Sequence, residues 1–300
     1  DLGEGKEEWI YNDEMVRPSG MIGTQYPDDT VNNLLNNMDY NSLRSLNSVT
    51  SYLTSQGYTS GKDFEKLQKA RKLSPSEYVL NSKLGFITLN INLNANQTLA
   101  VAYQYTVIGH DKVYQVGEFS DQSIADPNLL VTKLLKSTTI NTKMPMWDLM
   151  MKNVYNIRAY QVSQSDFIMN ILYLGNNNGV ATGYFADAEG DAKGQSLLHL
   201  MNLDNLNSQS NPIEGGDGLF DFINGATTSG GTINAATGRI YFPVLEPFGS
   251  HIRKIFENEP ALADKYAFDS LYSLTKASAE QYTDKNKFRL EGHYTSSSGS

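Results

Sequence analysis

The sequence has no cysteine among its 300 residues. This absence excludes disulfide bonds, thiolate nucleophiles and zinc sites with cysteine ligands. It leaves the compartment open, because a protein in an oxidising environment can do without cysteine.

Long hydrophobic runs are missing as well. A membrane-spanning helix needs roughly 18 consecutive apolar residues. The longest apolar runs here, residues 99–103 and 167–174, have the length of a strand, and Asn170 interrupts the second. We therefore expect no transmembrane helix.

Positive charge is in deficit, with 24 Lys and Arg against 33 Asp and Glu and a net charge of −9. No block of lysine and arginine stands out. Because binding to phosphate backbones needs clustered cations, we expect no nucleic-acid partner. The acidic excess favours solubility and affinity for divalent cations.

Helical patterns occupy the first part of the chain. Helix-start signals at residues 27–30 precede apolar residues at helical spacing that continue to Gly57. A second helix is predicted over 63–73, where Phe64, Leu67 and Ala70 form an apolar stripe. Residues 1–83 are therefore predicted to be a helical N-terminal part.

The period changes after Pro75. Apolar residues alternate over 87–93, and β-branched and aromatic residues fill 99–108 and 112–119. The Gly-His-Asp link between the last two runs has the length of a hairpin turn. We expect a three-strand β-meander over 84–120.

The rest of the chain, 121–300, is predicted to be β-rich, with long loops and a helical segment near 252–277. A short amphipathic helix is expected around residues 147–154. Strands are predicted at 155–162, 167–174, 239–244 and 288–294, the third at a sheet edge because it contains Pro243. The predicted fold class is α+β, a β-rich mixed module with antiparallel meanders and a few short helices. A doubly wound nucleotide fold is disfavoured, because strands and helices do not alternate.

Two acidic loops have the ligand types of a calcium site. Asp187, Glu189 and Asp191 lie in DAEGD, and Asp217 and Asp221 lie in EGGDGLFD. Neither loop has the full EF-hand pattern. These five residues are candidate ligands for a structural calcium ion, and a solvated turn is the alternative.

Catalytic patterns are weak. The histidines at positions 110, 199, 251 and 293 show no metal-ligand spacing and no nucleophile motif. A glycosidase needs two carboxylates that face each other across a sugar. Asp148, beside Trp147, and Glu246, near two aromatic residues, are of the right type, but their spacing in the sequence does not show that they face each other. We therefore expect no enzymatic activity, no catalytic residue and no cofactor beyond a structural calcium ion.

Tyrosines at alternating strand positions, such as Tyr103 and Tyr105, suit either packing within a sheet or stacking on sugar rings. Together with the acidic loops, they leave an extracellular carbohydrate-binding or adhesion domain as an alternative function.

Several longer strings resemble the SprA (also called Sov) family, the outer-membrane gliding-motility and secretion proteins of Bacteroidetes. The strongest is GRIYFPVLEPFGSHI at residues 238–252. Further strings lie within 99–119, 134–155, 197–209 and 293–300, so the resemblance covers most of the chain after about Leu84.

The resemblance implies a module of a translocon that functions in type IX protein secretion and gliding motility. It implies other secretion-system proteins and secreted cargo as partners. The parent chain would lie in the outer membrane, with this part in the periplasm or outside the cell. The chain is then expected to be an internal fragment, in which SSSGS at residues 296–300 is native sequence. The resemblance supplies no catalytic residue.

Overall fold

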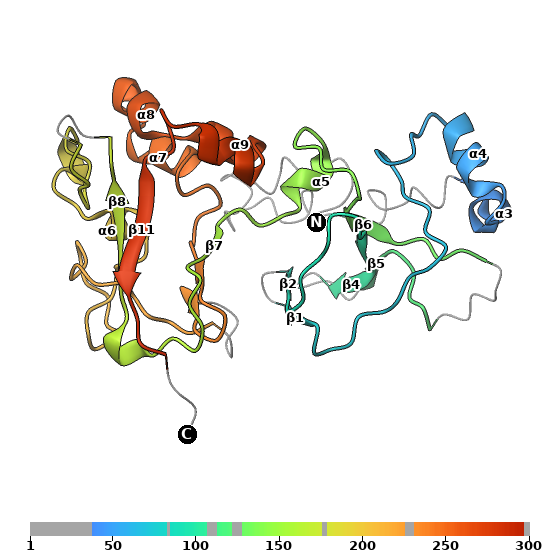
Figure 1. The fold of residues 1–300 in the computed structure, drawn as a ribbon, viewed down its shortest axis with the longest axis horizontal. Helices are drawn as coiled ribbons and strands as arrows, with labels where there is room; N and C mark the ends of the chain where they lie inside the picture. The colour runs from blue at the N-terminus through green and yellow to red at the C-terminus, as the bar shows by residue number, and fades with distance from the viewer. Residues whose placement is uncertain are drawn as a thin grey trace. The chain divides into compact units, whose positions relative to one another are not determined.

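The computed structural model describes residues 38–82, 85–106, 113–121, 128–175, 179–225 and 231–296. The chain divides into two compact units, Asp1–Met150 (unit 1) and Met151–Ser300 (unit 2). Each unit is described by itself, and Figure 1 labels their elements.

Unit 1 combines short helices with pairs of short strands. Its described elements are, in chain order, α3 (Tyr40–Arg44), α4 (Val49–Ser55), β1 (Tyr78–Asn81), β2 (Phe86–Leu89), β3 (Leu99–Val101), β4 (Tyr103–Thr106), β5 (Val113–Val116), β6 (Lys133–Lys136) and α5 (Pro145–Asp148). The strands form three antiparallel pairs, β1 with β2, β3 with β6, and β4 with β5. The pair β4–β5 is therefore nested between β3 and β6 in the chain.

A partly buried ion pair fastens α3 to the segments that flank β5 and β6. Arg44 Nη1 donates to Glu118 Oε2 at 2.5 Å and to the carbonyl of Leu129 at 2.6 Å. Glu118 also accepts from the N–H of Val131 at 2.8 Å. Burial by itself raises the pKa of Glu118, but the hydrogen bonds from Arg44 and Val131 outweigh it and lower this pKa.

The structure corrects three predictions in unit 1. Residues 63–73 form no helix: Phe64 pairs with Ser60 in a β-bridge, and Glu65 accepts hydrogen bonds from Ser137 and Thr138. The strands of 84–120 do not form one meander in the described chain, because β2 pairs with β1 and β3 pairs with β6. The helix expected around 147–154 is limited to α5, and Val154 begins a strand. The helical pattern of 28–57 is confirmed by α3 and α4, and its part before residue 38 lies outside the described residues.

Unit 2 mixes strands, helices and 3-10 turns. Its described elements are β7 (Val154–Asn156), η3 (Gln164–Asp166), β8 (Ile168–Tyr173), η4 (Gly190–Ala192), α6 (Leu197–Leu200), β9 (Ile233–Asn234), β10 (Arg239–Tyr241), α7 (Ser250–Ile255), α8 (Pro260–Tyr266), η5 (Asp269–Ser273), α9 (Lys276–Gln281) and β11 (Phe288–His293). One sheet has the order β7-β10-β9, and a second pairs β8 with β11, both antiparallel.

An aromatic cluster lies in the core of unit 2. Phe185 packs against Tyr266 with ring centroids 4.3 Å apart, and Tyr173 packs edge-on against the same ring at 5.0 Å. Phe248 packs on Phe288 of β11 at 4.7 Å. These rings join β8, β11 and α8 around one core, which the apolar faces of α6 and α7 also enter. Large aromatic side chains contribute most of the apolar area in such a core.

The turn between β9 and β10 packs closely on the loop after β7. Gly238 adopts φ +61, and a Cβ placed on it would lie 2.1 Å from the carbonyl oxygen of the fully buried Ala159. Only glycine satisfies both the left-handed backbone and this close approach.

Most predicted elements of unit 2 are confirmed, including β8, β11 and helices in the region 252–277. The edge position predicted for the strand with Pro243 is wrong, because β10 lies between β7 and β9. Pro243 lies two residues beyond Tyr241, the last residue of β10, where a missing N–H removes no ladder hydrogen bond. With short helices and antiparallel sheets in both units, the α+β class is confirmed.

Within the described ranges, no helix combines the length and the hydropathy that crossing a bilayer requires.

Candidate functional site

The first acidic loop is occupied by an ion pair. Asp187 accepts from the ammonium of Lys265 and from the hydroxyl of Tyr266, the latter at 3.2 Å. The hydrogen bond from Lys265 is the main reason why the pKa of Asp187 lies below its usual value. Glu189 immediately precedes η4, Asp191 lies within it, and both side chains are exposed. The loop thus attaches to α8 through one carboxylate.

The second acidic loop is organised around Asp204, a residue that the sequence analysis did not single out. Its side chain is 0% exposed. It accepts from the N–H of Asp217 at 2.8 Å, from the N–H of Gly218 at 3.0 Å and from Ser196 Oγ at 3.3 Å. A Cβ on Gly216 would lie 2.4 Å from this carboxylate, so the loop passes directly over it.

Asp221 completes a reciprocal arrangement. It accepts from the N–H groups of Asn205 and Leu206 at 2.7 and 3.2 Å. Burial is the main reason why the pKa of Asp221 is raised, and the charges of Asp204 and Asp217 add to it. Asp204 therefore binds backbone N–H groups shortly before Asp221, and Asp221 binds those just after Asp204. These two carboxylates close the loop between them.

These carboxylates are used for hydrogen bonding within the fold. In the part of the chain that the structure describes, no group of three or more His, Asp or Glu is placed to hold a metal ion. The five candidate ligands fall into two separate loops with different partners. The structural calcium ion predicted from the sequence stays a prediction.

Two of the histidines bind backbone carbonyls in unit 2. Nδ1 of His199 lies 2.6 Å from the carbonyl oxygen of Asp204, and Nε2 of His251 lies 2.7 Å from that of Leu200. Burial lowers the pKa of His251. His293 is exposed at the end of β11, and His110 lies outside the described residues. The described histidines thus have the structural surroundings expected from the sequence.

The two carboxylates considered for glycosidase chemistry belong to different units. Asp148 lies at the end of α5 in unit 1. Glu246 lies in unit 2, where its carbonyl accepts from the N–H groups of Gly249 and His251 at the start of α7. No observed geometry pairs them.

Tyrosines of β4 and β5 stack on one another. Tyr105 and Tyr114 are cross-strand partners with parallel rings 5.1 Å apart, and Tyr103 lies 6.2 Å from Tyr105. All three side chains are half-buried. This is the packing within a sheet that the alternating pattern predicted as one of two outcomes.

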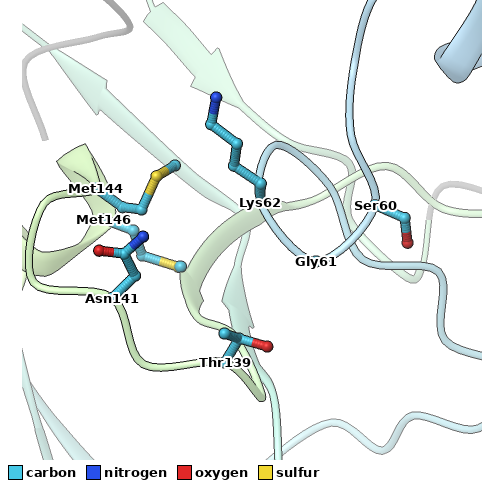
Figure 2. Close-up of a pocket in the computed structure, with 7 residues that line it drawn as sticks. All are labelled: Ser60, Gly61, Lys62, Thr139, Asn141, Met144 and Met146. Atoms are coloured by element: carbon cyan, nitrogen blue, oxygen red, sulfur yellow. The ribbon is translucent and has the colours of Figure 1, made fainter.

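A hollow of about 290 Å³ lies in the described part of unit 1. It is lined by Ser60, Gly61, Lys62, Thr139, Asn141, Met144 and Met146. Figure 2 shows Asn141 and Met144 on the segment leading into α5 and Met146 within that helix, on the side of the loop that carries Lys62. Adaptable methionine side chains beside one ammonium suit a ligand with an apolar body and an anionic end. The lining contains no carboxylate, histidine or thiol, so the hollow has the means to bind a ligand but no acid–base pair.

No protein-family model matches the chain, and no curated protein matches it.

Proposed function

We propose that this chain is a non-catalytic module of a SprA-like outer-membrane translocon that functions in type IX protein secretion and gliding motility. The proposal rests on the resemblance of several long strings to that family, above all residues 238–252 and 197–209. Agreement of many residues in several places is far more specific than a short motif.

The positions of these strings support a scaffolding role. In 197–209, the side chains of Leu197, Met201 and Leu203 have no exposed surface. In 238–252, Ile240 and Ile252 are equally buried. The strings that resemble the family therefore supply core residues, as expected for a structural module that presents a surface to other proteins.

The two strings also bind each other. The ring of His251, from the second string, lies 2.7 Å from the carbonyl oxygen of Leu200 in the first. The buried Asp204 of the first string then accepts from the N–H groups of Asp217 and Gly218 in the loop that follows. The resemblance thus covers an interlocked part of unit 2 and no cluster of reactive side chains.

The test is a replacement in the full-length parent protein. Residues 151–296 are replaced by a flexible Gly-Ser linker, and the parent is then followed by membrane fractionation, cargo export and gliding. The matched control carries Asp217→Asn, an exposed change in the same unit. We expect the replaced parent to stay in the membrane while export and gliding are lost and one or more envelope proteins no longer co-purify.

Normal export and gliding after the replacement would contradict the proposal. Loss of saturable glycan binding or surface adhesion, with normal export, would instead assign the chain to carbohydrate binding or adhesion. The exposed tyrosines of unit 2 offer aromatic side chains for such binding: Tyr160, Tyr184, Tyr282 and Tyr294.

A further inference from the structure

Residues 65–73 of unit 1 form an open stretch between α4 and β1. They contain no helix, strand or hydrogen-bonded turn, and no backbone group in them hydrogen-bonds to another described residue. Figure 1 draws the chain between α4 and β1 as a long tube without a helix. All side chains from Lys66 to Lys72 are exposed. The backbone of this stretch is therefore available to adopt another conformation.

The composition of the stretch favours a helix. Residues 65–73 read EKLQKARKL, and every one of them is among the stronger helix formers. In a helix, Phe64, Leu67 and Ala70 would share one face at spacings of three residues. The stretch is thus irregular despite a favourable intrinsic propensity, and some other force opposes the helix.

Repulsion between lysines is one force that opposes the helix. Lys62, Lys66 and Lys69 are spaced by four and three residues, and Lys72 follows three residues later. In a helix these four ammonium groups would form one column, and like charges at such spacings destabilise a helix in water. The nearby Glu65 cannot offset them in this structure, because it accepts hydrogen bonds from Ser137 and Thr138.

Both ends of the stretch are fixed while its middle is not. Lys66 Nζ donates to the carbonyl of Leu46 at 3.2 Å. Arg71 forms a two-pronged ion pair with Glu77 at 2.6 and 2.7 Å. Lys69 and Lys72 form no hydrogen bond or ion pair with the described residues. A partner that supplies negative charge can therefore reach two ammonium groups without breaking any existing ion pair.

Exposed apolar side chains occur within the stretch and in the strand that follows it. Leu67 lies within the stretch and is 42% exposed, while Val79 and Leu80 of the following β1 are 52% and 57% exposed. Cations next to exposed aliphatic side chains match the chemistry of a lipid surface, where anionic headgroups lie above an apolar layer. Nucleic acid would use the cations but leave the aliphatic side chains in water.

We propose that residues 62–73 fold into an amphipathic helix on an anionic phospholipid surface and dock unit 1 there. The headgroups neutralise the lysine column, which removes the repulsion that opposes the helix. Phe64 and Leu67 then enter the headgroup boundary. Because the whole chain carries −9, an anionic surface repels its other faces, and docking has one orientation. This proposal is independent of the proposed function.

The experiment uses the whole chain and two kinds of vesicle. One is pure phosphatidylcholine, and in the other about a third of the lipid is phosphatidylglycerol. Co-sedimentation measures binding, and far-ultraviolet circular dichroism measures helix content with and without vesicles. We expect binding to the anionic vesicles only, a gain in helix on binding, and a loss of both at high salt.

Three variants locate the effect. The pair Lys69→Gln and Lys72→Gln is expected to weaken binding roughly thirtyfold, since each lysine near an anionic surface contributes about one kcal/mol. The matched pair Lys143→Gln and Lys193→Gln removes the same charge from exposed sites elsewhere and should bind as the parent chain does. Ala70→Pro keeps the charge but prevents the helix, and should abolish the gain in helix content and weaken binding.

Equal binding to both vesicles, no binding to either, or equal weakening by the two lysine pairs would overturn the proposal. So would unchanged binding of Ala70→Pro, because it would show that the charges act without a helix. Binding to soluble polyglutamate but not to vesicles would assign the stretch to an acidic protein partner. Each variant is first compared with the parent chain without lipid, where unchanged dichroism shows that it is folded.

Discussion

The buried carboxylate of Asp204 gives the sharpest test of how unit 2 is held together. Substitution by asparagine keeps the size and shape of the side chain, but it replaces one acceptor oxygen with an NH₂ group. That group would face one of the two backbone N–H donors of Asp217 and Gly218. One hydrogen bond is lost, and the other no longer has a charged acceptor.

The expected cost follows from these contacts. A hydrogen bond to a charged group contributes about 1.5–3 kcal/mol, and a neutral one about half of that. Water can reach the loop, because Asp217 and Gly218 are exposed. We therefore expect Asp204→Asn to lower the free energy of unfolding of unit 2 by about 2–3 kcal/mol. For a unit of this size the melting temperature should fall by roughly 4–10 °C.

The assay separates the two units optically. Both tryptophans, Trp9 and Trp147, belong to unit 1, so their fluorescence follows that unit. Near-ultraviolet circular dichroism follows the tyrosines of both units, so the part of its transition that does not coincide with the tryptophan transition reports on unit 2. Asp204→Asn should shift the dichroism transition and leave the tryptophan transition in place. The control Asp217→Asn should change stability by no more than about 0.5 kcal/mol. Equal shifts for both variants would refute the stated role of Asp204.

Three further predictions concern backbone fit, the buried ion pair and pH. Gly238→Ala should destabilise unit 2 by more than about 2 kcal/mol in chemical denaturation, whereas Gly179→Ala, also at positive φ but with open space around it, should cost about 1 kcal/mol. Arg44→Met should lower the tryptophan-monitored stability of unit 1 by about 3–5 kcal/mol, because Glu118 is left half-buried and unpaired, and adding Glu118→Gln should recover part of the loss. Burial lowers the pKa of His251 in the folded chain, so its contribution to the free energy of unfolding is complete above the unfolded pKa of about 6.5 and is lost as the pH falls below that value. His251→Gln should flatten this part of the curve of stability against pH. An unchanged slope would contradict the role given to His251.

Local patterns in the sequence predict many elements but not their pairing. The alternation over residues 288–294 predicts a strand, and β11 confirms it. Nothing in that alternation indicates that β11 pairs with β8, which lies more than a hundred residues earlier. Pairing between distant strands depends on the packing of whole faces, and a single sequence carries that information only weakly.

The wrongly predicted helix and the overlooked Asp204 have different physical causes. The helix predicted over 63–73 rests on an apolar stripe, and it overlooks the column formed by Lys62, Lys66 and Lys69. The candidate carboxylates were chosen by their ligand type in glycine-containing loops, whereas Asp204 functions through its burial. A lone Asp beside Leu203 carries no signal of burial in the sequence, although a serine N-cap eight residues earlier contributes one of its donors. Charge spacing is visible in a sequence, but depth below the surface is not.

The pairing of β8 with β11 has a consequence for the order in which unit 2 assembles during synthesis. β8 leaves the ribosome long before Phe288–His293, its partner along the whole of Ile168–Tyr173. At about 5–20 residues per second, the intervening 115 or so residues take roughly 6–25 s to be made. Throughout that interval the strand-forming segment, with Met169 and Ile171 on its apolar face, has no sheet partner. Nascent chains of this protein are therefore expected to need a chaperone at β8 until their last strand emerges.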